Sequence, residues 1–182
     1  IDPLQKYCSE IKAIVHLAAT VPHSTYYPDN DESANQNRRI DRSIFELQKQ
    51  SNAPVIYMST CGLYDRSTSF LKHEDERTQL KISTPYFAAK ASGEQLFSSE
   101  GVSTILRLSA PVGTGLKPQL VLSRFITSAR NNKIISIWGS GSREQDFIDT
   151  ADIANLIIRI LERPKRATIN VASSKPITML KL

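Results

Sequence analysis

The sequence predicts an α/β protein built on a parallel sheet. Three short apolar segments, residues 13–19, 54–60 and 102–112, are rich in β-branched residues and are flanked by turn residues. Patterns typical of helices separate these segments. Strands that alternate with helices form parallel sheets whose strands are buried on both faces, which explains why these segments are apolar.

The first predicted helix covers about residues 31–50. Most of its residues are polar. Ile40, Ile44 and Leu47 follow the spacing i, i+4, i+7 and therefore form an apolar stripe along one side. This pattern predicts an amphipathic helix between the first two strands.

The second predicted helix covers residues 84–96 and carries the pair on which the candidate site is built. Pro85 suits a first helical turn, and the alanines and Glu94 that follow favour a helix. Tyr86 and Lys90 are four residues apart, so a helix places them on one face, one turn from each other. A phenol is a poor base at neutral pH, and a fixed ammonium beside it favours the phenolate. The pair is therefore a candidate acid–base device for a hydroxyl proton.

The remainder of the chain continues the alternation. Pro118 begins a predicted helix, residues 133–139 have the pattern of a strand, and residues 139–145 have that of a polar loop. Residues 149–163 have the clearest helical period in the chain, and residues 168–172 predict a final strand.

Composition argues against several classes of protein. The chain is 40% hydrophobic and 23% charged, which is ordinary for a globular protein, and no apolar run is long enough for a membrane helix. The first residues do not resemble a signal peptide. Two cysteines without metal-ligand spacing fit a reduced, cytoplasmic protein without a metal site. The net charge of +5 is compatible with an anionic ligand such as a nucleotide, but the basic residues are scattered, which disfavours nucleic-acid binding.

Polar and small residues follow each predicted strand at its carboxyl end, where open α/β sheets bind ligands. Residues 16–19 follow the first strand, Thr60 ends the second, and a segment beginning at Ser109 follows the third. We therefore expect Thr60, Tyr86 and Lys90 to meet in one crevice. A hydroxyl, a phenol and an ammonium suit removal of a proton from an alcohol as a hydride leaves its carbon.

Six motifs follow one another along nearly the whole chain: IVHLAA, YMSTCGLYD, YFAAKASGE, ILRLSAPVGTG, WGSGSREQDFIDTADIA and INVASSKPIT. In this order they resemble motifs of the extended short-chain dehydrogenase/reductase family, in particular its NAD-dependent nucleotide-sugar epimerase/dehydratase group. The first is similar to that family's fourth strand. The others are similar to its Ser-Ser/Thr-x-x-x-Tyr-Gly, Tyr-x-x-x-Lys-x-x-x-Glu, Arg-x-x-Asn-x-Tyr-Gly, Gly-x-Gly-x-x-x-Arg-Asp-Phe and Asn-x-Gly-x-Gly-x-x-x-Thr segments. Each motif alone is weak, and their common order carries the resemblance.

The resemblance implies roles for four residues in catalysis. Tyr86 would be the general acid/base. Lys90 would lower the pKa of Tyr86 and hold the ribose hydroxyls of the nicotinamide cofactor. Thr60 would hydrogen-bond the reacting oxygen of the substrate. Asn37 either supports a water relay to the lysine, as in the family, or is a plain solvated helix residue.

The resemblance also implies binding residues. Ala18 and Ala19 would line the ribose of the cofactor, since small residues permit close backbone approach. Pro111 and Val112 either neighbour the nicotinamide carboxamide or pack at a strand end. Arg143 either binds a substrate phosphate or is a solvated loop arginine.

Several positions depart from the family's pattern. Cys61 and Gly62 follow Thr60 where the dehydratases carry acidic residues, which disfavours dehydratase chemistry. Position 110 is alanine where asparagine is common, and Gln145 replaces the arginine that usually precedes Asp-Phe. Of the remaining polar candidates, we interpret His16 as structural, His73 as a surface residue and Asp152 as a favourable charge at a helix N-terminus.

The family's Gly-x-x-Gly-x-x-Gly fingerprint is not in this sequence, in which all seven glycines lie at position 62 or later. The resemblance therefore implies a piece of a longer parent, without its N-terminal glycine-rich half and its C-terminal end. We expect the 182-residue chain alone to bind a dinucleotide weakly or not at all and to be inactive. We also expect an uncovered sheet edge to favour a homo-oligomer or a partner.

The predicted architecture is a partial Rossmann-like, doubly wound parallel sheet with part of a small substrate-binding subdomain. Residues 1–113 and 147–182 would form the Rossmann-like domain, and residues 114–146 the subdomain. The predicted activity of the parent is that of an NAD(P)-dependent epimerase or reductase acting on a nucleotide sugar, with NAD favoured as cofactor. The alternative is a non-catalytic relative that binds or senses a dinucleotide. The sequence does not distinguish NAD from NADP, epimerase from reductase, or one sugar from another.

Overall fold

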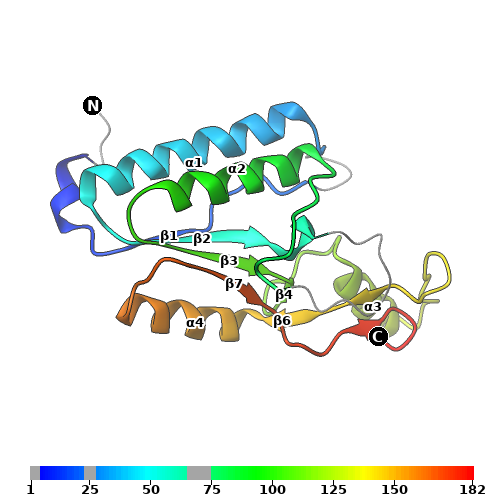
Figure 1. The fold of residues 1–182 in the computed structure, drawn as a ribbon. Coiled ribbons are helices and arrows are strands. Elements are labelled where there is room, and N and C mark those ends of the chain that lie inside the picture. Colours follow the sequence, from blue (N-terminus) through cyan, green and yellow to red (C-terminus); the bar gives the residue numbers. More distant parts are fainter. Residues whose placement is uncertain (1–4, 23–27, 65–74) are drawn as a thin grey trace. The chain divides into compact units, whose positions relative to one another are not determined.

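The structure is a computed structural model that describes residues 5–22, 28–64 and 75–182 (Figure 1). The predicted surface residue His73 lies outside the described residues. The chain divides into two compact units. The first consists of Ile1–Leu108 and Leu156–Asn170, and the second of Ser109–Asn155 and Val171–Leu182.

The first unit is organised on a sheet of four strands in the order β1-β2-β3-β7. The strands are β1 (Ile14–His16), β2 (Val55–Thr60), β3 (Ser103–Leu108) and β7 (Ala167–Val171). β1 pairs with β2 and β2 with β3, both in parallel, so that Ile14 lies opposite Val55 and Val55 opposite Ser103. The predicted α/β fold with a parallel sheet is confirmed.

Helices cover both faces of this sheet. α1 (Asp31–Ser51) and α2 (Pro85–Ser99) lie side by side on one face, and the C-terminal half of α4 (Thr150–Glu162) lies on the other (Figure 1). Two short 3-10 helices, η1 (Gln5–Glu10) and η2 (Cys61–Leu63), precede β1 and follow β2. The sheet is therefore enclosed by helices, as its apolar strands require.

Local capping sets the starts of α1 and α2. The Asn30 side chain accepts from the Ser33 N–H at 2.9 Å, and the Ser33 hydroxyl accepts in turn from the Asn30 N–H, which forms a capping box. Thr84 caps α2 by accepting from the Phe87 N–H at 3.3 Å, and Pro85 occupies the first turn. Both helices therefore begin where the sequence places turn and cap residues.

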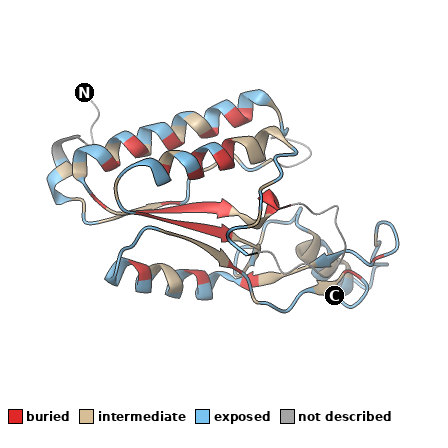
Figure 2. Cartoon of the chain, in the orientation of Figure 1, coloured by how far each residue is buried: buried red, intermediate tan, exposed pale blue. Residues whose placement is uncertain are grey.

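The core lies between the α1–α2 layer and the sheet, where β2 and β3 are buried along nearly their whole length (Figure 2). The Tyr57 and Phe97 rings lie 4.8 Å apart, and Phe45 meets Phe97 edge to face at 6.0 Å. Burying one large apolar side chain stabilises a fold by about 1.5–3 kcal/mol, and packed aromatic pairs add to that. The buried side chains of this core form one hydrophobic cluster: Phe45, Val55, Tyr57, Phe97 and Ile105.

The buried side of α1 differs from the predicted stripe. Ile40, Ile44 and Leu47 are only half-buried. The fully buried side is mostly polar: Ser33, Ala34, Asn37, Asp41, Phe45 and Gln48. The hydrophobic period located the helix correctly but placed its inward face one residue away, because hydrogen-bonded polar side chains occupy that face.

The second unit contains short strands and one helix of its own. β4 (Ala110–Val112) pairs in parallel with β6 (Phe147–Asp149), and β5 (Glu144–Gln145) pairs antiparallel with β8 (Ile177–Thr178). α3 (Val121–Arg130) has no fully buried residue. The Asp146 carboxylate accepts from both hydroxyl and N–H of Ser173 and from the Ser109 hydroxyl, so one acidic side chain ties β4 to the C-terminal segment.

Two predicted strands are corrected here. The strand expected over residues 102–112 is two strands in different sheets, β3 and β4, because the hydrogen-bond partner changes at this point: the Ser109 N–H donates to the Val171 carbonyl, and the Ala110 N–H donates to the Asp146 carbonyl. Residues 133–139 form no strand: Ile134 is 91% and Trp138 85% exposed, and the segment has no strand partner within the described part of the chain. High β-propensity does not form a strand without a ladder to join.

No helix in the described ranges combines the length and the apolar character that a membrane span needs.

Candidate active site

The N-terminal half of α2 carries the predicted Tyr86–Lys90 pair. The helix places the two residues one turn apart, with Tyr86 half-buried and Lys90 only 5% exposed. Asp29, which lies just before α1, accepts from the Tyr86 N–H at 2.7 Å. The start of α2 is therefore tied to the start of α1.

The Lys90 ammonium is buried, and its direct contacts are with uncharged groups. Its Nζ donates to the Met58 carbonyl at 2.8 Å and lies 4.7 Å from the centroid of the Tyr57 ring. No carboxylate forms an ion pair with Lys90 among the described residues. Burial lowers the pKa of Lys90, although the negative charges of Asp41 and Glu94 oppose that shift.

Thr60 lies at the carboxyl end of β2, two residues beyond the carbonyl that Lys90 binds. Its Oγ1 accepts from the Gly62 N–H at 3.0 Å and so begins η2. Gly62 lies against the Phe87 ring, since a Cβ there would come within 2.6 Å of a ring carbon. The loop after Thr60 therefore touches the first turn of α2, while Lys90 reaches the same end of β2 from the second turn.

The pKa of Tyr86 is raised to about 12, first by burial and then by the negative charges of Asp29 and Asp41. This direction is opposite to the lowering that the sequence analysis attributes to Lys90. With these surroundings the phenol keeps its proton at neutral pH, and it needs additional positive charge nearby to act as a base.

Asn37 positions the segment that follows β1. Its Oδ1 accepts from the Thr20 N–H at 2.7 Å, and its Nδ2 donates to the Thr20 carbonyl at 2.9 Å. Asn37 is buried, so it is not the plain solvated residue of the alternative reading. One donor and one lone pair of the amide are left over from these bonds. The adjacent Ala18 and Ala19 are exposed and half-buried, respectively, which leaves their backbone open to close approach.

A second buried cluster lies under the C-terminal half of α2, and the sequence analysis assigned it no role. Arg107 on β3 donates to both carboxylate oxygens of Glu94, at 2.7 Å from Nη2 and 3.0 Å from Nε. It also donates to the Tyr64 hydroxyl at 2.8 Å, and Ser59 donates to Glu94. Glu94 is the last residue of the segment similar to Tyr-x-x-x-Lys-x-x-x-Glu, and Arg107 is the arginine of the segment similar to Arg-x-x-Asn-x-Tyr-Gly. These two motif positions are the sequence signal for the pair.

Asp41 was also missed. It is 3% exposed and faces the sheet from α1, where its carboxylate contacts the His16 ring nitrogen Nε2 and accepts from the Tyr57 hydroxyl. Its signal in the sequence is an acidic residue four positions after Asn37 on the same helix face. His16 is buried and hydrogen-bonded, as the structural interpretation requires.

The remaining predicted binding residues belong to the second unit. Pro111 and Val112 lie in β4, with Pro111 exposed. Arg143 is exposed and lies with Arg124, Phe125 and Trp138 on the wall of a cavity of about 280 Å³. This cavity offers two guanidinium groups and two aromatic faces, the groups that bind phosphates and planar rings. Asp152 lies in the first turn of α4, as predicted.

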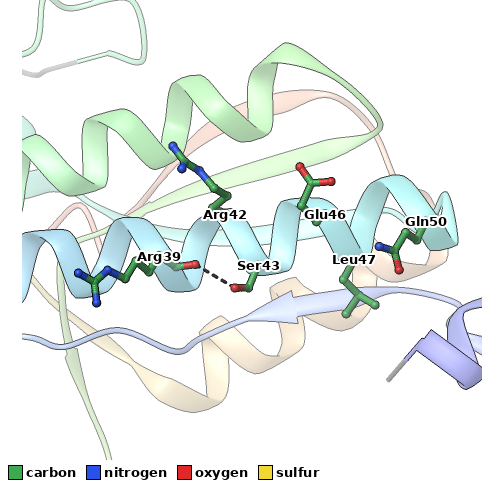
Figure 3. A pocket seen from close by; sticks show the side chains of 6 residues that line it. All are labelled: Arg39, Arg42, Ser43, Glu46, Leu47 and Gln50. Atoms are coloured by element: carbon green, nitrogen blue, oxygen red, sulfur yellow. Dashed lines mark hydrogen bonds between the residues drawn. The ribbon is translucent and has the colours of Figure 1, made fainter. Parts of the chain in front are cut away.

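The exposed side of α1 has a shallow hollow of about 410 Å³, which Figure 3 shows. The Ser43 hydroxyl donates to the Arg39 carbonyl there, as serines in helices commonly do. The hollow contains no group of the Tyr86–Lys90 site. Its lining comes from one helix face: Arg39, Arg42, Ser43, Glu46, Leu47 and Gln50.

Comparison with known proteins identifies the family. Residues 1–172 match the model of the NAD dependent epimerase/dehydratase family. The chain belongs to this family. The resemblance seen in the six motifs is thereby confirmed, and the members are NAD-dependent enzymes with a Rossmann-like fold.

Individual relatives are distant and longer than this chain. A dTDP-4-dehydro-6-deoxy-D-allose reductase from Streptomyces bikiniensis is 26% identical over 94% of this chain and 57% of the relative. The solved UDP-N-acetylglucosamine 4-epimerase from Methanobrevibacter ruminantium M1, in complex with UDP-N-acetylmuramic acid, has a TM-score of 0.88 and 24% identity over 98% of this chain and 60% of its own. A Bacillus cereus UDP-glucuronic acid 4-epimerase, solved with UDP-4-deoxy-4-fluoro-glucuronic acid and NAD, has a TM-score of 0.81 and 22% identity over 98% and 59%. The chain spans less than two thirds of each.

Proposed function

We propose that the protein to which this chain belongs is an NAD(P)-dependent epimerase or reductase acting on a nucleotide sugar, and that Tyr86, Lys90 and Thr60 perform its proton transfer. The observation that carries the proposal is the buried Lys90 ammonium, held by a carbonyl at the carboxyl end of β2, one turn from Tyr86. Burying an ammonium without an ion pair costs stability, and such costs concentrate at functional sites.

The residues fit a nicotinamide dinucleotide at this end of the sheet. Of the three N–H donors on Lys90, the described contacts use one, which leaves two for ribose hydroxyls. Ala18 and Ala19 follow β1, the strand next to β2, and offer small side chains. When bound, the dinucleotide supplies a hydride acceptor or donor. NAD is favoured over NADP because the family is NAD-dependent.

Each residue then has a defined task. Tyr86 Oη removes the proton from a substrate hydroxyl while Thr60 Oγ1 holds the same oxygen in place. Lys90 stabilises the phenolate that the transfer requires, against the burial that raises the pKa of Tyr86 to about 12. Asn37 holds the backbone at Thr20. Cys61 and Gly62 after Thr60 offer no carboxyl group for eliminating water, which disfavours a dehydratase.

We further propose that residues 114–146 belong to the substrate-binding subdomain and that residues 1–113 and 147–182 belong to the Rossmann-like domain. The cavity lined by Arg124, Arg143 and Trp138 supports the first assignment. Its guanidinium groups suit the diphosphate and its aromatic faces the base of a nucleotide sugar. Pro111 and Val112 would lie beside the carboxamide of the cofactor.

Tyr86→Phe in the full-length protein tests the proposal. With UDP- and dTDP-hexoses and NAD, we expect kcat to fall by about 10²–10⁴-fold, the usual contribution of a positioned acid/base, with little change in substrate binding. Tyr64→Phe is the matched control, since it removes a tyrosine hydroxyl that bonds Arg107 and Asn170; its folded fraction should turn over like the parent.

A Tyr86→Phe variant with nearly parental kcat would show that another group moves the proton. No turnover by the parent with any sugar nucleotide, together with retained dinucleotide binding, would favour the non-catalytic alternative.

A further inference from the structure

A buried carboxylate on α1 lies in the same layer as Lys90, between helix and sheet. Asp41 is 3% exposed, and each of its oxygens has a partner. Oδ1 lies 2.8 Å from His16 Nε2, and Oδ2 accepts from the Tyr57 hydroxyl at 3.0 Å. An ionised carboxylate only accepts, so Nε2 of His16 carries the proton in this contact. The geometry holds the carboxylate in one place.

The Tyr57 ring connects this carboxylate to Lys90. Its hydroxyl donates to Asp41, and its ring lies 4.7 Å from the Lys90 Nζ. Burial and the Asp41 charge raise the pKa of Tyr57, so its hydroxyl remains a donor. A phenol that donates to a carboxylate has a more electron-rich ring, and such a ring attracts a cation more strongly.

Gly93 allows α2 to approach this group closely. It lies three residues after Lys90, and a Cβ at its position would overlap the Tyr57 hydroxyl and come within 2.6 Å of Asp41 Oδ2. A glycine within a helix is less favourable than an alanine. The close packing of α2 on Asp41 and Tyr57 leaves no room for a side chain and explains why glycine occupies position 93.

The elements around Lys90 in the described part of the unit carry several charged and titratable side chains. They include His16 on β1, Asp41 on α1, Tyr57 on β2, Arg107 on β3, and Tyr86 and Glu94 on α2. Glu94 already binds Arg107 through both oxygens. Asp41 has a tyrosine hydroxyl and a histidine ring as partners, and it is the stronger of the two charges that oppose the effect of burial on the Lys90 pKa.

We propose that Asp41 is a positioning residue for Lys90: held by His16 and Tyr57, its carboxylate is the buried counter-charge that keeps the Lys90 ammonium protonated over the Tyr57 ring. The link from Lys90 to catalysis rests on the proposed function. The electrostatic link from Asp41 to Lys90 does not depend on that function, because it is argued from the contacts that Tyr57 makes with both groups. Asp41 does not touch the reacting atoms, so it acts through Lys90.

The test is to titrate Lys90 directly. In full-length protein labelled with ¹³C-lysine, the Cε signal of Lys90, assigned by its loss in Lys90→Arg, is followed against pH without substrate. Asp41→Asn keeps the size of Asp41 and removes its charge; one acceptor oxygen becomes an NH2 donor, which the oxygen of the Tyr57 hydroxyl can accept. We expect Lys90 in Asp41→Asn to lose its proton at lower pH than in the parent.

Gln48→Leu is the matched control. Gln48 is a buried polar residue on the same face of α1, two turns later, and it bonds Ser103 instead of Tyr57. Its loss should leave the Lys90 titration unchanged. Asp41→Thr, which is neutral and smaller, serves if the asparagine variant does not fold, and should move the titration in the same direction.

The pH profile of kcat/KM gives a second readout. Because Lys90 would lose its charge earlier, the alkaline limb in Asp41→Asn should move to lower pH, with a loss of about ten-fold at mildly alkaline pH that is recovered on acidification. A merely structural role would lower activity equally at all pH values.

The outcomes separate the two proposals. An unchanged Lys90 titration in both Asp41 variants overturns the inference and leaves the proposed function untouched. If Lys90 loses its proton at lower pH in Asp41→Asn but activity does not change, the inference is supported and Lys90 is not part of the reaction. An equal shift in Gln48→Leu overturns the inference, since any buried polar change in α1 would then have the effect.

Discussion

Each half of α2 is associated with a buried cation, and the protein holds the two cations in different ways. Lys90 belongs to the N-terminal half, and Arg107 on β3 lies under the C-terminal half. Under the C-terminal half, Arg107 forms a two-pronged ion pair with Glu94 and also bonds Tyr64. Burial alone would lower the pKa of Arg107, but these partners raise it. In the N-terminal half, Lys90 of the helix itself has a carbonyl and a ring as its nearest partners, and burial lowers its pKa.

The difference teaches how one helix can combine stability with reactivity. A cation held by a carboxylate and by further acceptors is fixed in charge and position and serves the structure. A cation with unused donors and a lowered pKa can respond to a ligand. The opposite pKa directions of the two groups therefore distinguish a structural tie from a candidate reactive group.

Breaking the ion pair between Glu94 and Arg107 should have the largest effect on stability. Glu94→Leu leaves the Arg107 guanidinium buried without its counter-charge, which typically costs about 3–5 kcal/mol. Chemical denaturation of the full-length protein measures this loss. Glu94→Leu combined with Arg107→Met is the control and should recover most of it, because no unpaired charge remains. A single variant as stable as the parent would contradict the comparison.

The residue between the two halves should have an intermediate effect. Gly93→Ala would normally stabilise a helix by about 1 kcal/mol. Here the added methyl group meets Tyr57 and Asp41, so we expect a net destabilisation of about 1–3 kcal/mol. The neighbouring Ser92→Ala, at an exposed position of α2, is the matched control. Equal stability of the two variants in thermal unfolding would show that α2 can shift away from Asp41.

The smallest expected effect is a change in the pH dependence of stability. The pKa of Lys90 is lower in the folded protein than the ordinary value of 10.5, so between these values the unfolded chain binds more protons. Lys90 therefore destabilises the fold below its lowered pKa, and stability rises with pH up to about 10.5.

Lys90→Met should remove this rise, and the difference in unfolding free energy between parent and variant should shift in favour of the parent as pH increases. Measurements should stay below about pH 10, because the raised pKa of Tyr86 makes stability fall between about pH 10 and 12 in both proteins. A difference that stays constant with pH would contradict the lowered pKa.

Much of this protein follows from its sequence because the relevant forces are local. The alternation of apolar runs with helical patterns predicts the parallel sheet, and Asn30, Thr84 and Pro85 mark where helices begin. The separation of four residues places Tyr86 and Lys90 on one face. Periodicity, caps and spacing act within a few residues of chain, so they can be recognised without the fold.

Tertiary structure decided what depends on neighbours distant in sequence. The β-rich segment 133–139 finds no strand to join among the described residues, so its propensity is not realised. The polar inward face of α1 is stable only because the strands bring partners such as His16 and Tyr57 to Asp41. The charge around Lys90 likewise depends on burial and on a carboxylate 49 residues away in the chain. Burial and long-range electrostatics belong to the assembled fold, and spacing along the sequence does not contain them.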